Sequence, residues 1–145
     1  MKISKRAKAL ALAGTFAATA LVAAAGPAQA ASASTAASIC GSGFWADASY
    51  SLPGGIIYVS YNGSTDCAVL MKTVNVGTPT WTKAYIGLDG RPGTGYGGNQ
   101  GDGMDDGQFT TYAGPVYVYA PHECINAAGE TSVSDYYNTG PVLCG

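Results

Sequence analysis

The clearest strand pattern in the sequence is Pro115-Val116-Tyr117-Val118-Tyr119-Ala120-Pro121, in which small or branched apolar residues alternate with tyrosine. Because side chains alternate across a strand, this period sends the valines to one face and Tyr117 and Tyr119 to the other. Proline cannot donate a hydrogen bond to a neighbouring strand, so the two flanking prolines favour an edge position. The stretch therefore predicts an edge strand with one buried and one exposed face.

Strand-like stretches separated by turn residues continue on both sides of this segment. In residues 80–88, Ala84, Ile86 and Leu88 alternate with more polar neighbours. No stretch after residue 30 holds a helical period over three turns, and short strands with frequent turns are typical of sandwiches and barrels. We therefore expect an all-β fold, a small antiparallel β-sandwich or barrel with two disulfides. The expected strands are 56–61, 67–76, 80–88, 108–112, 116–120, 123–126 and 132–137, the last two as a hairpin around Ala128-Gly129.

The cysteines indicate an oxidising compartment. There are four, Cys40, Cys67, Cys124 and Cys144, which allow three pairings. We expect Cys40–Cys67 and Cys124–Cys144, because each pair closes a local segment and the pairs lie at opposite ends of the domain. No pair has the short spacing of a zinc knuckle, which disfavours a zinc site.

The N-terminal residues have the three parts of a secretory signal peptide. These are a basic start through Lys8, an apolar run over 9–25, and Ala28-Gln29-Ala30 as a cleavage site. The apolar run is shorter than the ~20 residues that a membrane span needs. We expect a signal peptide over 1–30, a flexible Ala/Ser leader over 31–38 and a single β-domain over 39–145. The mature protein is expected to be secreted and to have no membrane contact after cleavage.

The charge of residues 31–145 excludes two classes of protein. This part holds three basic residues against nine carboxylates, a net charge of −6. It therefore lacks the basic surface of a nucleic-acid-binding protein, and equally that of a protein drawn to anionic lipid. The single histidine of the chain excludes a multi-histidine metal site.

The most unusual stretch is residues 87–107, which is rich in glycine and aspartate. Asp102, Asp105 and Asp106 are weak candidates for calcium ligands, although their spacing does not fit an EF-hand loop. Residues 93–98 match a dinucleotide fingerprint only formally, because no βαβ unit surrounds them. We interpret the stretch as a long solvated hairpin loop, and expect no bound metal and no cofactor.

The residues that could support catalysis are few. His122 follows Pro121 at the end of a strand, where an ordinary surface turn is expected, and no Gly-x-Ser-x-Gly elbow accompanies it. Glu123 and Glu130 flank an expected turn, and a glycosidase needs two acids in a cleft that so small a domain seldom frames. We therefore expect no catalytic residues and predict that the protein is not an enzyme.

Aromatic residues give the stronger signal. All ten tyrosines and both tryptophans lie after residue 30. Contiguous exposed rings can stack on sugars or dock on proteins, because they give a large contact area at low entropy cost. Tyrosine is also a favoured strand residue, and some rings can simply cover a small core. The candidate binding face consists of Trp81, Tyr85, Tyr112, Tyr117 and Tyr119.

Three segments carry a family resemblance. They are Cys40-Gly41-Ser42-Gly43-Phe44, Ile57-Tyr58-Val59-Ser60-Tyr61-Asn62-Gly63-Ser64, and Phe109-Thr110-Thr111-Tyr112-Ala113-Gly114-Pro115-Val116-Tyr117-Val118-Tyr119-Ala120. In these segments the chain resembles the spore-associated protein A family of actinomycetes, and the resemblance runs from Cys40 to Cys144. Residues 90–107 are longer than the family leads us to expect and gain no support from it. The resemblance implies a small exported protein associated with aerial hyphae and spores, with no assigned catalytic activity and no catalytic residues to transfer.

These observations predict a secreted, non-catalytic protein of the spore or cell surface that adheres through its Tyr-rich strand face. The expected partners are cell-wall polymer or other surface proteins, including further copies of this chain. A carbohydrate- or cell-wall-binding module is one alternative, and a small secreted inhibitor or toxin is another. The glycine-rich loop argues against an inhibitor, because ordering such a loop on binding costs free energy.

Overall fold

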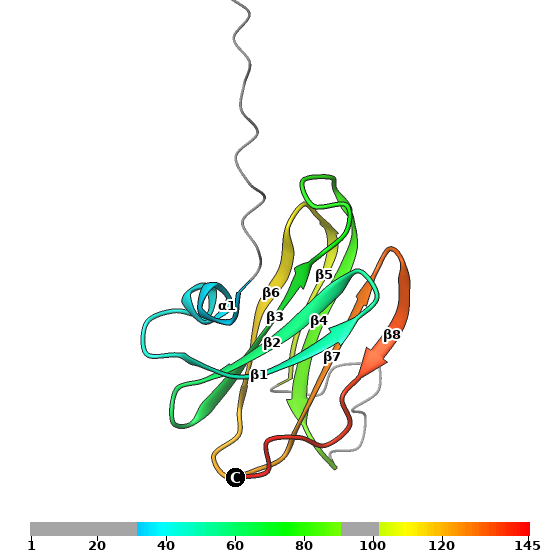
Figure 1. Ribbon diagram of the computed structural model, residues 1–145. Coiled ribbons are helices and arrows are strands. Elements are labelled where there is room, and N and C mark those ends of the chain that lie inside the picture. The colour runs from blue at the N-terminus through cyan, green and yellow to red at the C-terminus, as the bar shows by residue number, and fades with distance from the viewer. Residues whose placement is uncertain (1–31, 91–101) are drawn as a thin grey trace, which may run out of the picture.

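The computed structural model describes residues 32–90 and 102–145, in which eight antiparallel strands form two sheets beside one short helix (Figure 1). Sheet 1 has the strand order β1-β2-β3-β6, and sheet 2 has the order β5-β4-β7-β8. The expected signal peptide over 1–30 and most of the expected glycine-rich loop, residues 91–101, lie outside the described residues. The elements are α1 (Ala33–Cys40), β1 (Trp45–Leu52), β2 (Gly55–Tyr61), β3 (Thr65–Lys72), β4 (Thr80–Leu88), β5 (Gly103–Phe109), β6 (Tyr112–Tyr119), β7 (Ile125–Thr131) and β8 (Ser134–Asn138).

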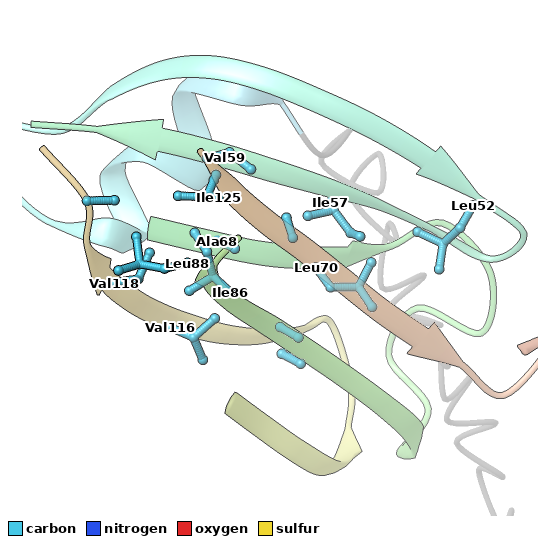
Figure 2. Packing of buried hydrophobic residues seen from close by; sticks show 14 residues of the cluster. Leu52, Ile57, Val59, Ala68, Leu70, Ile86, Leu88, Val116, Val118 and Ile125 are labelled. Atoms are coloured by element: carbon cyan, nitrogen blue, oxygen red, sulfur yellow. The ribbon is translucent and has the colours of Figure 1, made fainter. Parts of the chain in front are cut away.

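The core lies between the two sheets and is built from the inward-facing residues of both. Figure 2 shows side chains from β2, β3 and β6 packed together with side chains from β4 and β7. The predicted all-β fold is therefore confirmed, and of the two expected architectures the sandwich is found. The alternation of residues 116–120 is confirmed as well, and β6 lies at the edge of sheet 1. The labelled core residues are Leu52, Ile57, Val59, Ala68, Leu70, Ile86, Leu88, Val116, Val118 and Ile125.

The expected hairpin around Ala128-Gly129 is wrong, because these residues lie in the middle of the buried strand β7. A Cβ atom on Gly129 would stand 3.1 Å from Cδ2 of Leu70 and 3.3 Å from Cδ1 of Ile57. Glycine is therefore needed there for the close packing of the two sheets, and the turn falls at 132–133 instead.

The expected solvated loop over 87–107 is also wrong for its last part. Residues 103–107 belong to β5, which pairs along β4 from Thr80↔Phe109 to Ile86↔Gly103. At Gly103 a Cβ atom would stand 2.6 Å from the backbone nitrogen of Tyr117. The glycine thus allows the start of β5 to approach β6 closely.

The expected flexible leader over 31–38 is replaced by a helix. Ser32 caps α1 by accepting a hydrogen bond from the amide of Thr35 at 3.1 Å. Ala36 and Cys40 of the helix are buried against the outer face of sheet 1, beside Tyr58 and other residues of β2 and β3. Small alanine side chains permit this close contact, so low-complexity composition does not mean flexibility here. Within the described residues, no helix has the length and apolar character needed to cross a membrane.

Both predicted disulfides, Cys40–Cys67 and Cys124–Cys144, are confirmed. The first joins the end of α1 to β3 and so fixes the helix on sheet 1. The second joins the start of the β7 segment to the C-terminal residues, which run beside the end of the sandwich.

A buried lysine closes the opposite end of β3. Lys72 is 5% exposed, and its ammonium group donates to the backbone carbonyls of Asn75, Thr78 and Phe109 at 3.0, 2.8 and 2.9 Å. Burial lowers the pKa of this ammonium group. The three hydrogen bonds hold the β3–β4 loop against the β5–β6 turn, a role that the sequence did not reveal.

Candidate functional site

The five residues of the candidate binding face do not form one surface. Trp81 and Tyr85 lie on the outer side of β4 in sheet 2, whereas Tyr112, Tyr117 and Tyr119 lie on the outer side of β6 in sheet 1. The outer faces of the two sheets of a sandwich point away from each other. The expected contiguous Tyr-rich face is therefore wrong as a five-residue unit.

Tyr85 lies on a different sheet from the three β6 tyrosines, and it is also buried. Only 3% of the residue is exposed, and its hydroxyl donates a hydrogen bond to Asp102 Oδ2 at 2.7 Å. Burial, followed by this hydrogen bond, raises the pKa of Tyr85 above its usual value. The sequence pattern placed Tyr85 correctly away from the core but could not show that neighbouring residues cover it.

The weak calcium candidates Asp102, Asp105 and Asp106 do not form one cluster, because Asp102 precedes β5 and binds the Tyr85 hydroxyl, whereas Asp105 and Asp106 project from opposite faces of β5. Asp105 turns towards β6 and accepts a hydrogen bond from the amide of Gly114 at 2.7 Å. Asp106 follows it on the strand and so points to the opposite face, where it lies in register with Lys83. Within residues 32–90 and 102–145, no group of three or more His, Cys, Asp or Glu residues has an arrangement that could hold a metal ion.

The acids and the histidine considered for catalysis are dispersed in the same way. Glu123 is exposed in the turn after β6, whereas Glu130 is near the far end of β7, in register with Lys83. His122 lies in the same turn as Glu123, with a positive φ of 60°. It borders a pocket together with Asp66, an acid that the sequence did not single out.

One hollow on the described surface is an open groove between α1 and the start of β1, with a volume of about 780 Å³. Its aromatic residues are Phe44 and Trp45, and Trp45 is 53% exposed. The other described residues of the lining are three serines and several alanines and glycines, and none of them is charged. The lining residues are Ala33, Ser34, Ala37, Ser38, Gly41, Ser42, Gly43, Phe44, Trp45 and Ala46.

The two aromatic residues of this groove are held by further rings. Trp45 meets Tyr61 edge to face at a centroid distance of 5.6 Å, and Phe44 meets Tyr117 at 5.8 Å. The Tyr117 hydroxyl donates a hydrogen bond to the carbonyl of Cys40 at 3.0 Å, which ties β6 to the end of α1. The exposed indole of Trp45 is therefore held in place by its contact with Tyr61.

A second pocket of about 320 Å³ opens at one end of the sandwich. Its titratable lining residues are Asp47, Tyr61, Asp66 and His122. Asp66 is only 4% exposed, and its pKa is raised to about 6, mainly by burial and then by the negative charge of Asp47. The remaining lining residues are Ala120, Leu143, Cys144 and Gly145.

Neither hollow was predicted from the sequence. The sequence did not single out Trp45 as a binding residue, because most residues of β1 are exposed and the strand lacks a clear apolar alternation. A signal was nevertheless present, since Phe44-Trp45 directly follows the turn residues after Cys40. The pocket around Asp66 carries no local signal, because its residues come from four separate parts of the chain.

The fold and the two hollows define a small disulfide-bonded β-sandwich with an aromatic groove and an acidic end pocket. No family model matches the chain, and no solved structure matches it significantly. The chain is 32% identical over 106 residues to a protein named Spore-associated protein A, from Streptomyces coelicolor. This match covers 70% of the present chain and 62% of the length of that relative. The chain is thus related to spore-associated protein A, in agreement with the resemblance found in its sequence.

Proposed function

We propose that this protein is an exported, non-catalytic protein of the spore or cell surface, and that it adheres to cell-wall polysaccharide through the groove between α1 and β1. The relationship to a protein named for its association with spores supports the location and the non-enzymatic role. The two disulfides are consistent with an extracellular setting.

The observation that carries the proposed adhesion is the exposed indole of Trp45 in a groove whose described lining residues include no charged side chain. An aromatic ring gives a sugar a flat apolar surface, and the serine hydroxyls beside it supply both donors and acceptors. The contacts of Trp45 with Tyr61 and of Phe44 with Tyr117 reduce the entropy that binding would cost. Adhesion is therefore assigned to this groove in place of the strand face that the sequence suggested.

Co-sedimentation with isolated cell wall, chitin and cellulose tests the proposal. Trp45→Ala is expected to weaken pelleting by about 30-fold in Kd, the value of a central aromatic contact of ~2 kcal/mol. Trp81→Ala is the matched control, because Trp81 is 39% exposed but lies on the other sheet. Equal pelleting of the two variants would refute adhesion through the groove.

A second experiment separates adhesion to polymer from self-assembly. Sedimentation velocity over a range of protein concentrations is expected to show one species in the absence of polymer. Pelleting that occurs only together with concentration-dependent oligomers would favour self-assembly instead.

A further inference from the structure

The end pocket is built around the carboxylate of Asp66, which has no counter-ion among the described residues. Asp66 is only 4% exposed, yet no described residue donates a hydrogen bond to its carboxylate. Buried carboxylates are normally paired with a cation or with several donors, because removing a charge from water is costly. The position of Asp66 on the wall of a pocket means that a partner can reach it from outside.

The second carboxylate of the pocket is placed by an irregularity in β1. Ala46 pairs with Ser60 and Ala48 with Val59, so Asp47 is an extra residue in a β-bulge. Bulges redirect a side chain and are frequent beside binding sites. Asp47 is exposed, borders the same pocket, and is near enough for its charge to act on Asp66. Two like charges at one small pocket attract a cation, because a cation between them reduces their mutual repulsion.

Among residues 32–90 and 102–145, both lysines are already held elsewhere. The described residues include two lysines, Lys72 and Lys83, and no arginine. Lys72 lies at the other end of β3 from Asp66, about 20 Å away along the strand, and binds three carbonyls. Lys83 is buried on β4, opposite Asp106 and Glu130 of the neighbouring strands.

The rest of the pocket suits an alkyl chain. Ala120 and Leu143 provide apolar surface, the ring of Tyr61 forms part of the wall, and the Cys124–Cys144 disulfide fixes the C-terminal side. An aromatic ring also attracts a cation through its π-electrons. The volume of about 320 Å³ lies at the lower end of small-molecule sites. His122 is the remaining titratable side chain of the described lining.

From this arrangement we propose that the end pocket binds a primary ammonium group on a short alkyl chain, with Asp66 and Asp47 as its carboxylate partners. The ammonium can belong to a free amine or to a lysine side chain of another protein. The site has a different lining from the proposed adhesion groove, because Asp66 does not line the groove, although the two adjoin where Tyr61 of the pocket contacts Trp45 of the groove.

The test is an NMR titration of the uniformly labelled, oxidised protein with butylammonium at pH 7.5, followed through backbone amide shifts. Saturable shifts at Tyr61 and Asp66 are expected, and 1-butanol, which has a similar shape but no charge, is expected to give none. A blocked Gly-Lys-Gly peptide forms the second arm. Binding of the peptide at least tenfold tighter than butylammonium would identify a protein lysine as the source, and equal binding would identify a free amine.

Variants decide whether the carboxylates are responsible. Asp66→Asn is expected to weaken butylammonium binding at least about tenfold, as the loss of a charged hydrogen bond would. Asp47→Asn is expected to weaken it by a smaller factor, and Asp135→Asn, an exposed acid on β8, to have no effect. The proposal is overturned if 1-butanol binds as well as butylammonium, or if Asp66→Asn binds butylammonium like the unaltered protein. Neither result depends on Trp45 or on polysaccharide binding.

Discussion

Replacing Asp66 by asparagine is expected to stabilise the protein at neutral pH. The pKa of Asp66 is raised to about 6, first by burial and then by the charge of Asp47. A carboxyl group with a raised pKa holds its proton more tightly in the folded than in the unfolded protein. Folding stability therefore falls as the pH rises from about 4 to about 6 and then stays constant. Asparagine has nearly the same shape but cannot ionise, so the variant escapes this loss.

The size of the effect follows from the difference between the two pKa values. A rise from 3.8 to about 6 corresponds to about 3 kcal/mol at pH 7, since each unit is worth 1.36 kcal/mol. Solvent that enters the open pocket screens the charge, so we expect about 1.5 to 3 kcal/mol. For a domain of this length that range corresponds to a rise in Tm of roughly 6 to 12 °C.

Thermal unfolding of the oxidised protein between pH 3 and pH 8 measures this effect. The unaltered protein and Asp66→Asn are expected to differ most at pH 7 and to converge below pH 4. Asp135→Asn provides the control, because Asp135 is exposed. Curves that stay parallel between pH 4 and pH 7 would refute the reasoning. An Asp66→Asn protein less stable at pH 7 would show instead that the carboxylate has a structural partner.

Three further changes test the packing of the fold. Changing Cys40 and Cys67 together to serine is expected to lower the free energy of unfolding by about 3.5 kcal/mol, because the disulfide joins residues 27 positions apart in the sequence. The same change is expected to expose α1 to proteolysis. Urea unfolding measures the first effect and limited digestion measures the second. Lys72→Met should cost about 3 kcal/mol in the same urea assay, because it leaves three carbonyls without their donor, and an unchanged midpoint would contradict this role. Gly129→Ala should cost about 1 to 3 kcal/mol, because the added methyl group would press on Leu70; a neutral result would mean that the sheets separate easily.

The parts of the fold that could be predicted are those with a local cause. The alternation in β6 and β4 placed the inward side chains correctly, and the spacing of the cysteines led to the right pairing. The errors lie where tertiary packing overrides local preference. Glycine at 129 reads as a turn signal, yet it is required by the close approach of the two sheets. The Ala/Ser segment before Cys40 reads as a linker, yet its small side chains let α1 lie flat on sheet 1.

The candidate sites were less predictable, because each depends on which surface remains uncovered. Tyr85 and Trp81 have the same orientation on β4, but one is 3% exposed and the other 39%. Alternation reports only the side of a strand from which a residue projects, whereas neighbouring strands and loops decide whether that residue meets solvent. Asp66 shows the converse, since it continues the inward row of β3 and becomes reachable only because the sandwich opens at that end.

The excess of carboxylates excludes some classes of partner, and it also indicates one class of partner that the protein could bind. A surplus of carboxylates rules out anionic partners, but most surface acids are solvated and imply no partner at all. Asp66 differs because burial raises the energy of its charged form, and within the described residues both lysines are committed elsewhere. A cation from outside the protein would form with the Asp66 carboxylate the ion pair that no described residue forms with it. The same surplus of negative charge would draw such a cation towards the molecule before it reaches the pocket, with a strength that falls as the salt concentration rises.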